Sequence, residues 1–295
     1  MSNYSVEPIY LKSGDETLGA DLYRPVMRFR KPPLIIMAHG FGAERKFGLP
    51  KFAERFAETG YAVLLFDYRC FGGSTGKPRE LVSPTLQLED WRSVIQQARK
   101  RKDIDTKRIY LWGTSLSGGH VLTMAAREKG IRAVMAMVPH VDGVASSLLY
   151  PKHHLPSVLA AATRDLAGSK LGREPVRIPV VAPHGVRCLA GDDCYADYMA
   201  LVPSGASWTG RIPARIMLSI TRYRPTREMP KIRIPVLLIA AAMDSLIPIE
   251  ATRLAAHQVK SCEYTEWPMS HFAPYRGEWF EKAITTQLNF LQRQQ

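Results

Sequence analysis

Short apolar runs alternate with amphipathic stretches through most of the 295-residue chain. Runs of this kind lie at residues 33–38, 61–66, 109–112, 131–138 and 234–242. They are typical of strands that a parallel sheet buries on both faces. Because helical patterns separate them, the alternation predicts an α/β fold: a mostly parallel, twisted sheet with helices on both faces.

Proline, serine and glycine mark the ends of the predicted helices. The stretch 49–59 has Pro50 in its first turn and Gly60 directly after it, and Ser83 with Pro84 begins a second helix. The remaining predicted elements are a strand pair at 7–11 and 18–23, a helix that ends at Gly130, a strand at 262–267 and a final helix at 277–293.

The alternation stops between residues 141 and 230, which hold nine of the 21 prolines and only short helical pieces at 155–166 and 195–201. We interpret this insertion as a helical lid over the carboxyl ends of the strands, where open α/β sheets bind ligands. The predicted division is therefore an N-terminal part of the core at 1–140, the lid at 141–230 and a C-terminal part of the core at 231–295.

Apolar and aromatic side chains of the predicted lid are candidates for lining an acyl pocket. The alternative is that they pack the lid onto the core, which apolar lid residues do more often. The candidates are Leu148, Leu149, Tyr150, Leu155, Leu159, Tyr195, Tyr198, Met199, Trp208 and Met217.

The turn after the run at 109–112 carries the main candidate for chemistry. Gly113, Ser115 and Ser117 form a Gly-x-Ser-x-Ser sequence between a predicted strand and a predicted helix. Small residues on both sides let strand and helix approach closely and place Ser115 at the apex of a tight turn. The pattern alone is weak evidence, because small residues are common in such turns.

A serine hydroxyl needs a base to act as a nucleophile at neutral pH. Asp244 and His271 each follow a predicted strand in the C-terminal part, which gives the chain order Ser, Asp, His. We expect His271 to accept the Ser115 proton, and Asp244 to orient the imidazole and stabilise the imidazolium. Asp142, after the strand that precedes the lid, is the alternative acid.

The run at 33–38 ends in a His-Gly-Phe-Gly turn that begins at His39. Such a turn can point a backbone N–H at a developing oxyanion. We assign the two oxyanion-hole donors to the N–H groups of Phe41 and of Leu116, the residue after the nucleophile. The glycines around Phe41 carry more of this evidence than the side chains do.

Other polar residues favour structural roles. His39 is expected to brace its glycine turn, His120 to be a hydrogen-bonded core histidine, and Asp67 to order the loop that follows it. The acidic pair at 192–193 favours a turn, and the histidine pair at 153–154 lacks further ligands and favours a solvated loop.

Taken with these motifs, the chain resembles the α/β-hydrolase-fold serine hydrolases over nearly its whole length. The His-Gly-Phe-Gly turn and residues 52–69 are similar to a subgroup that contains esterases and the fungal polyketide transferases. The resemblance implies acyl chemistry at Ser115. Two positions depart from the family pattern, since Ser117 replaces the elbow glycine and Cys70 stands where a glycine is common; neither removes a catalytic atom.

The four cysteines form no Cys-x-x-Cys pair and no histidine lies at a spacing suited to zinc, so no metal and no cofactor is predicted. Free thiols are favoured, with a disulfide between Cys188 and Cys194 as the alternative in an oxidising compartment. No apolar run reaches the roughly 18 residues of a membrane span, and the start of the chain lacks the pattern of a secretory signal. These features predict a cytoplasmic enzyme without a membrane span.

The formal net charge of +13 suggests an acidic partner. Because the basic residues are scattered and no aromatic-interleaved motif accompanies them, no nucleic-acid partner is predicted. Coenzyme A, an acyl carrier protein or a carboxylate-bearing ester would use the same field. The alternative is a basic surface without a specific partner.

The residues therefore predict a carboxylesterase that cleaves small-molecule carboxylic esters through an acyl-enzyme on Ser115. The alternative is an acyltransferase or thioesterase of specialised metabolism, which uses the same residues with an acyl thioester donor. A non-catalytic ligand-binding protein of this fold is less favoured, because a binding protein does not need Ser115, Asp244 and His271 together.

Overall fold

The computed structural model describes residues 3–26, 31–191 and 194–294. Its central feature is an eight-stranded sheet with the order β1-β2-β4-β3-β5-β6-β9-β10. Pairing is antiparallel from β1 through β2 to β4 and parallel from β4 to β10. The strands are β1 (Tyr4–Ser13), β2 (Glu16–Pro25), β3 (Pro33–Ala38), β4 (Ala62–Phe66), β5 (Asp105–Thr114), β6 (Ala133–Met137), β9 (Val236–Ala241) and β10 (Cys262–Trp267).

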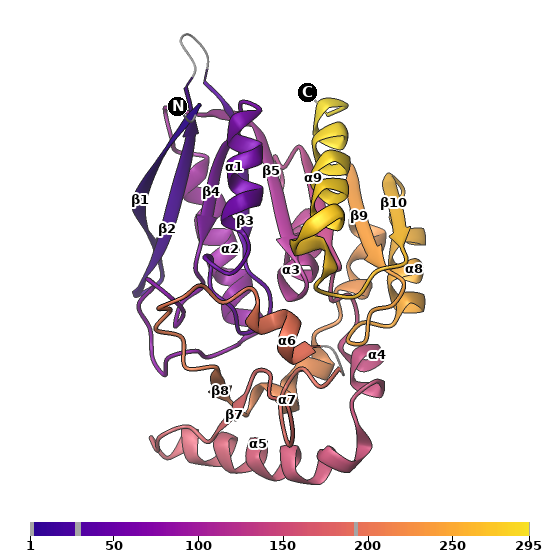
Figure 1. Cartoon of the computed structure of the whole chain (residues 1–295). Helices are drawn as coiled ribbons and strands as arrows, with labels where there is room; N and C mark the ends of the chain where they lie inside the picture. Colours follow the sequence, from indigo (N-terminus) through magenta and orange to yellow (C-terminus); the bar gives the residue numbers. More distant parts are fainter. Residues whose placement is uncertain (1–2, 27–30, 192–193, 295) are drawn as a thin grey trace.

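Helices cover both faces of this sheet (Figure 1). α1 (Pro50–Glu58) and α9 (Gly277–Gln292) contact each other on one face, α2 (Pro84–Ala98) and α3 (Leu116–Arg127) contact each other on the other, and α8 (Ile249–His257) packs against β9 and β10. β3, β4, β6 and β9 are buried along their whole length, as strands covered on both faces must be. The predicted α/β fold is confirmed.

Two predicted helix starts agree with the structure and one predicted end does not. Pro50 opens α1, and Pro84 opens α2 behind the extended residue Ser83. α3 ends at Arg127, three residues before the predicted Gly130, because Glu128 already adopts an extended backbone with φ −102° and ψ 131°. Glu128 is also held by ion pairs, so the chain leaves the helix before it reaches the glycine.

The segment between β6 and β9 forms the layer at the bottom of Figure 1, beyond the carboxyl ends of the parallel strands. The division at residues 141 and 230 stays a prediction, but this segment has the irregular character that its prolines indicate. It contains α4 (Gly143–Leu148), η1 (Lys152–His154), α5 (Leu155–Lys170), β7 (Arg177–Pro179), α6 (Cys194–Met199), β8 (Arg211–Pro213), α7 (Ile216–Ser219), η2 (Ile220–Arg222), η3 (Pro225–Arg227) and η4 (Met229–Lys231).

One buried carboxylate holds this segment together. Asp165 on α5 accepts hydrogen bonds from Val176 N at 2.9 Å and from Arg215 N at 2.9 Å, and its Oδ2 lies 2.7 Å from Arg215 Nε. Its side chain is fully buried, so the paired charge and the backbone donors together compensate for its desolvation. This cluster ties α5 to both strands of the small β7–β8 sheet through their flanking residues.

We expect Gly113→Ala to lower the free energy of unfolding by about 1–3 kcal/mol, the usual cost of overpacking. A Cβ at Gly113 would lie 2.2 Å from the backbone oxygen of Ser117. Gly168→Ala on α5 is the control, because its nearest neighbour would be Arg173 Cβ at 3.6 Å. That change should be neutral or stabilise by up to about 1 kcal/mol. Urea denaturation measures both, and equal effects would contradict the packing argument.

Candidate active site

Ser115 lies between the last residue of β5 and the first residue of α3. Its backbone has φ +54° and ψ −122°, a conformation that costs a non-glycine residue about 1–3 kcal/mol. Two backbone hydrogen bonds hold it: Ser115 N donates to Met137 O at 3.0 Å, and His140 N donates to Ser115 O at 2.8 Å. The strained turn is therefore fixed by the end of β6 and the residues after it.

Ser117, at the position of the missing elbow glycine, points into the core. Its side chain is fully buried, and its Oγ lies 2.8 Å from the Tyr68 hydroxyl, which also accepts a hydrogen bond from Trp91 Nε1 at 2.8 Å. The extra hydroxyl is thus satisfied inside the packing between α3 and the sheet. This arrangement explains why a serine is tolerated there.

The structure brings Ser115, His271 and Asp244 together, although they come from different parts of the chain. His271 Nε2 lies 3.0 Å from Ser115 Oγ, and His271 Nδ1 lies 2.6 Å from Asp244 Oδ2. The side chains of His271 and Asp244 are only 2% and 3% exposed, so water does not compete for these hydrogen bonds. The three groups form one continuous hydrogen-bonded chain.

The loop after β9 fixes the orientation of the Asp244 carboxylate. Its Oδ1 accepts hydrogen bonds from Leu246 N at 2.8 Å and Ile247 N at 2.9 Å. Because one oxygen is occupied by these backbone donors, the other faces His271. A short helix, η5 (Ala273–Tyr275), follows the loop that carries His271.

Asp142, the alternative acid in the sequence analysis, is engaged elsewhere. As the N-cap of α4 it accepts hydrogen bonds from Val144 N at 2.9 Å and Ala145 N at 3.2 Å. Its Oδ2 lies 2.8 Å from Arg224 Nη2 and accepts a hydrogen bond from Thr226 Oγ1 at 3.0 Å. These four contacts saturate the carboxylate, which therefore holds α4 and η3 in place.

The His-Gly-Phe-Gly turn packs directly on the Ser115 turn. A Cβ on Gly40 would lie 3.1 Å from Ser115 Cβ, so only glycine lets the two turns approach without displacement. The backbone N–H groups of Phe41 and Leu116 have no acceptor among the described residues, and both residues line the cavity beside Ser115. Their role as the two oxyanion-hole donors stays a prediction.

Two aromatic residues support this turn in a way that sequence analysis missed. The Tyr198 hydroxyl donates to Phe41 O at 3.1 Å, and Trp208 Nε1 donates to Gly42 O at 2.8 Å. Their rings stack with centroids 5.5 Å apart. Each bond joins a side chain to a backbone oxygen more than 150 residues away, so no local pattern predicts it.

His39 and Asp67 brace the same region. His39 Nδ1 lies 3.0 Å from Gly40 O, as expected for a brace of the turn, and burial lowers the pKa of this histidine. Asp67 accepts hydrogen bonds from Gly73 N at 3.1 Å, within the loop that it was expected to order, and from Arg45 N at 2.7 Å. The hydrogen bond from Arg45 N to Asp67 was not predicted from the sequence.

His120 is a core histidine, as predicted. Its ring nitrogens lie 2.6 Å from the Tyr223 hydroxyl and 3.0 Å from Gln87 Oε1, and burial lowers its pKa to about 3. The histidine pair at 153–154 forms a short 3-10 turn rather than a loop. The acidic pair at 192–193 lies outside the described residues.

A mainly apolar cavity of about 400 Å³ opens beside Ser115. Ser115, Phe41, Leu116 and His140 are among the residues that line it. Six of the ten predicted lid candidates line it, namely Leu148, Leu149, Tyr150, Leu155, Leu159 and Met217. Val158, Cys188, Leu189, Leu246 and Ile247 add to this wall.

The remaining four candidates lie elsewhere. Tyr198 lines a small space of about 30 Å³ next to Ser115 and His271. Trp208 supports the turn at Gly42, and neither Tyr195 nor Met199 lines a cavity beside Ser115. For these residues, packing and support are the better interpretation.

The four cysteines are not joined by a disulfide bond, all of them lying in the described part of the chain. Cys194 Sγ instead lies 3.8 Å from Ser245 Oγ. Among the residues that the structure describes, no three His, Cys, Asp or Glu side chains are grouped to hold a metal ion. Over the same residues, every helix is too short or too polar to cross a membrane.

Comparison with known proteins identifies the family of the chain. The family model described as serine aminopeptidase, S33, matches residues 31–267, which is most of the chain. The chain belongs to this α/β-hydrolase family. The resemblance predicted from the sequence is thereby confirmed at the level of the family.

The chain is similar to two proteins with different named activities and to one solved structure. It is 40% identical over 286 residues to the quorum-quenching protein AidA of Acinetobacter baumannii, covering 97% of this chain and 94% of the relative. It is 26% identical to the thiohydrolase aneE of Aspergillus aculeatus, covering 88% and 85% of the two chains. The solved structure of DcsB in complex with its substrate analogue shares the fold, with a TM-score of 0.86, 22% identity and coverage of 99% and 100%.

We expect Asp142→Asn to lower the free energy of unfolding at pH 7 by about 1–3 kcal/mol, because it removes a charge that is paired with Arg224. Burial tends to raise the pKa of Asp142, but the hydrogen bonds from Arg224, Ala145 N and Thr226 outweigh it and the pKa is lowered. A lowered pKa stabilises the folded state above the unfolded value of about 4 and loses that contribution as pH falls further.

The difference between wild type and Asp142→Asn should therefore shrink as the pH is lowered from about 5 through the lowered pKa. Urea denaturation at a series of pH values measures it. A difference that is constant down to pH 3 would show that the Asp142 charge does not contribute.

Proposed function

We propose that this protein is a serine hydrolase that cleaves small-molecule carboxylic esters through an acyl-enzyme on Ser115. The observation that carries the proposal is the hydrogen-bonded chain from Asp244 through His271 to Ser115 Oγ, which opens onto an apolar cavity. A binding protein would have no need to hold a strained serine against a buried histidine and carboxylate.

In the proposed reaction, Ser115 Oγ attacks the ester carbonyl carbon while its proton passes to His271 Nε2. The carbonyl oxygen becomes an oxyanion and accepts hydrogen bonds from the N–H groups of Phe41 and Leu116. Asp244 accepts the Nδ1 hydrogen bond and stabilises the imidazolium. The C–O bond then breaks, the leaving alkoxide takes the proton from His271, and the acyl group remains on Ser115.

Water then releases the acyl group, with water as the nucleophile and Ser115 as the leaving group. His271 takes a proton from the water, the hydroxide attacks the acyl carbon, and the Ser115 oxygen leaves with the proton that His271 returns. The apolar cavity would hold the acyl chain, because its wall is formed by leucine, valine, isoleucine and methionine side chains. The proposed enzyme needs no metal and no cofactor.

A second candidate function uses an acyl thioester donor, so that a C–S bond breaks and the enzyme acts as a thioesterase or acyltransferase. It is favoured by the thiohydrolase relative, which covers 88% of this chain.

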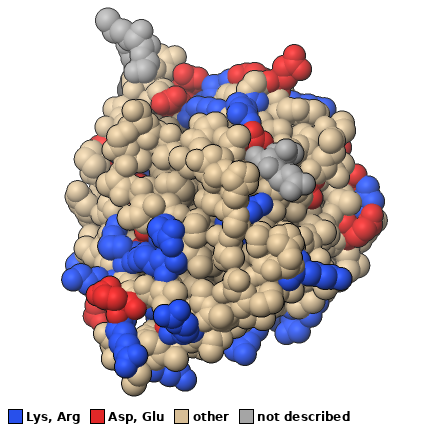
Figure 2. All heavy atoms as spheres, turned by 60° about the horizontal axis from the view of Figure 1, so that its bottom comes forward, with Lys and Arg blue, Asp and Glu red and all other residues tan. Residues whose placement is uncertain are grey.

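The net charge of +13 would help to attract an acidic donor such as coenzyme A or an acyl carrier protein. Figure 2 shows that Lys and Arg on the visible face occur in several separate groups rather than one continuous patch. Such a distribution supports small acidic partners over an extended polyanion such as nucleic acid. Cytoplasmic residence is part of the same proposal.

Ser115→Ala should lower kcat by about 10³-fold or more and abolish labelling by a fluorophosphonate, because no other group can take the acyl chain. Labelling detected by intact-mass spectrometry and initial rates on nitrophenyl esters measure the two effects. Ser117→Gly is the matched control and should keep kcat within about an order of magnitude, since its hydroxyl bonds to Tyr68 in the core. An active, labelled alanine variant would overturn the proposal.

The acid is tested by Asp244→Asn, which should lower kcat about 10²- to 10⁴-fold while the protein stays folded. Asp142→Asn is the control, because its carboxylate caps α4 and does not contact His271. A larger loss of activity at Asp142 than at Asp244 would reverse the assignment. Rates on acyl-coenzyme A thioesters, beside the matching nitrophenyl esters, distinguish the candidate substrates.

The acyl cavity is tested by Leu159→Gln, which should lower kcat/KM for a decanoyl ester about tenfold, as expected for a polar group on an apolar wall. The acetyl ester, which does not reach this wall, should change by less than about twofold. Leu166→Gln is the matched control, because Leu166 is an exposed leucine on the same helix, α5, and does not line the cavity. Identical chain-length profiles for both variants would contradict this location.

A further inference from the structure

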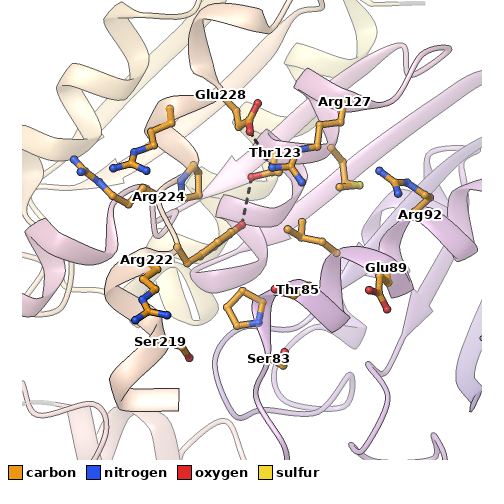
Figure 3. A pocket seen from close by; sticks show the side chains of 16 residues that line it. Ser83, Thr85, Glu89, Arg92, Thr123, Arg127, Ser219, Arg222, Arg224 and Glu228 are labelled. Carbon is orange, nitrogen blue, oxygen red and sulfur yellow. Dashed lines mark hydrogen bonds and ion pairs between the residues drawn. The ribbon is translucent and has the colours of Figure 1, made fainter. Parts of the chain in front are cut away.

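A second cavity, of about 650 Å³, lies apart from Ser115, His271 and Asp244. Figure 3 shows it between α2, the C-terminal half of α3 and residues 219–228. Its volume is within the range of small-molecule sites. The residues that distinguish it are five arginines: Arg92, Arg127, Arg222, Arg224 and Arg227.

Three of these arginines are paired with carboxylates. Arg92 Nε lies 3.0 Å from Glu128 Oε1, Arg127 Nη2 lies 2.8 Å from Glu228 Oε1, and Arg224 Nη2 lies 2.8 Å from Asp142 Oδ2. These pairs position the guanidinium groups around the cavity. Glu128 also lies 3.4 Å from Arg99 Nη1 and Glu228 3.0 Å from Lys231 Nζ, so these carboxylates compensate the positive charge only in part.

Arg222 and Arg227 differ, because neither has a carboxylate within 4.0 Å in the part of the chain that the structure describes. Both are exposed. The other carboxylate on the wall, Glu89, lies 3.5 Å from Arg69 Nη2 and is 53% exposed. The lining, with five arginines and two glutamates, therefore carries an excess of positive charge, and Arg222 and Arg227 are its two arginines without a carboxylate partner among the described residues. Figure 3 shows Arg222 on the side opposite Arg92, so the guanidinium groups surround the hollow.

Apolar side chains form part of the remaining wall, beside the hydroxyl groups of Ser83, Thr85, Thr123 and Ser219. Pro84 and Leu88 of α2, Met124 of α3 and Pro225 line it together with Tyr223. The Tyr223 hydroxyl is bound to His120 Nδ1 at 2.6 Å, which holds the ring in place. A ligand that fits this wall has an apolar or aromatic body as well as negative charge.

We propose that this cavity binds an organic phosphate, with its phosphate groups on Arg222 and Arg227 and its apolar body against Tyr223, Leu88 and Met124. Arginine suits phosphate because its planar guanidinium donates two parallel hydrogen bonds to phosphate oxygens. Two unpaired arginines match the charge of a phosphate dianion. The positive end of the α2 dipole, at Ser83 to Thr85 on the same wall, adds to the attraction.

The proposal does not depend on the proposed hydrolase activity, because the two cavities share no residue. They do share a wall, since Met217, Ile220 and Thr221 line the apolar cavity while Ser219 and Arg222 line this one. The same short helices thus separate an acyl-type cavity from an anion-type cavity.

Isothermal titration of the full chain with adenosine 3′,5′-bisphosphate at low ionic strength tests the site, with adenosine as the uncharged probe. We expect saturable one-to-one binding of the bisphosphate and none of adenosine. Binding should weaken at least about tenfold in Arg222→Gln/Arg227→Gln, given the strength of charge-assisted hydrogen bonds. Raising the salt to ~0.5 M should also weaken it.

Arg164→Gln/Arg173→Gln is the matched control. It removes the same two charges from exposed arginines outside the cavity, and should change the affinity by less than about twofold. Equal losses in both double variants would assign the binding to the general basic field and overturn the proposal. Absence of saturable binding, or equal binding of adenosine, would overturn it too.

Circular dichroism establishes that the double variant is folded. If it is not, Arg222→Lys serves in its place, because it keeps the charge but loses the planar guanidinium. That variant should bind the bisphosphate at least about threefold more weakly than wild type, as expected when one of two parallel hydrogen bonds is lost. Unchanged affinity would overturn the assignment of Arg222.

Discussion

The close contact between the end of β5 and the start of α3 is the constraint on which the candidate active site depends. At Gly113 there is no room for a Cβ beside the Ser117 carbonyl oxygen. Strand and helix can approach this far only because the chain turns sharply between them, and the turn forces Ser115 to a positive φ. The strain is sustained by the neighbouring strand β6 and the residues after it, which bond to both sides of Ser115.

The same contact explains how surrounding residues acquire their roles. The hydroxyl of Ser117 is turned into the core, where Tyr68 and Trp91 accommodate it. On the outer side, Gly40 lets the His-Gly-Phe-Gly turn lie against Ser115. The candidate oxyanion donors are therefore close to the cavity because the two turns pack so tightly that Gly40 has no room for a side chain. Tyr198 and Trp208 support the His-Gly-Phe-Gly turn through hydrogen bonds to Phe41 O and Gly42 O.

The segment between β6 and β9 contributes residues to both cavities. One side of α7 and η2 contributes apolar side chains to the cavity at Ser115, and the other contributes Arg222 to the arginine-lined cavity. Asp142 joins two parts of this segment, because it caps α4 and pairs with Arg224. Asp142 is the alternative catalytic acid by its position in the sequence. In the structure its contacts hold the chain in place.

The sequence by itself determined the fold class, since apolar runs at 33–38 and 234–242 that alternate with helical patterns are typical of a covered parallel sheet. It also marked Ser115, because the small residues around it are a local requirement of the strand-to-helix turn. Helix starts at Pro50 and Pro84 were predicted for the same reason, whereas the end of α3 was not, because it depends on where Glu128 finds its partners.

Only the tertiary structure decided which acid faces His271. Asp142 and Asp244 both follow strands of the same sheet, and both accept hydrogen bonds from two backbone N–H groups just after them. They differ in the group that meets the second oxygen, which is Arg224 for one and His271 for the other. Which partner each acid meets, like the support of Phe41 by Tyr198, depends on contacts between residues far apart in the chain. These contacts form only when the sheet and the segment between β6 and β9 have packed together.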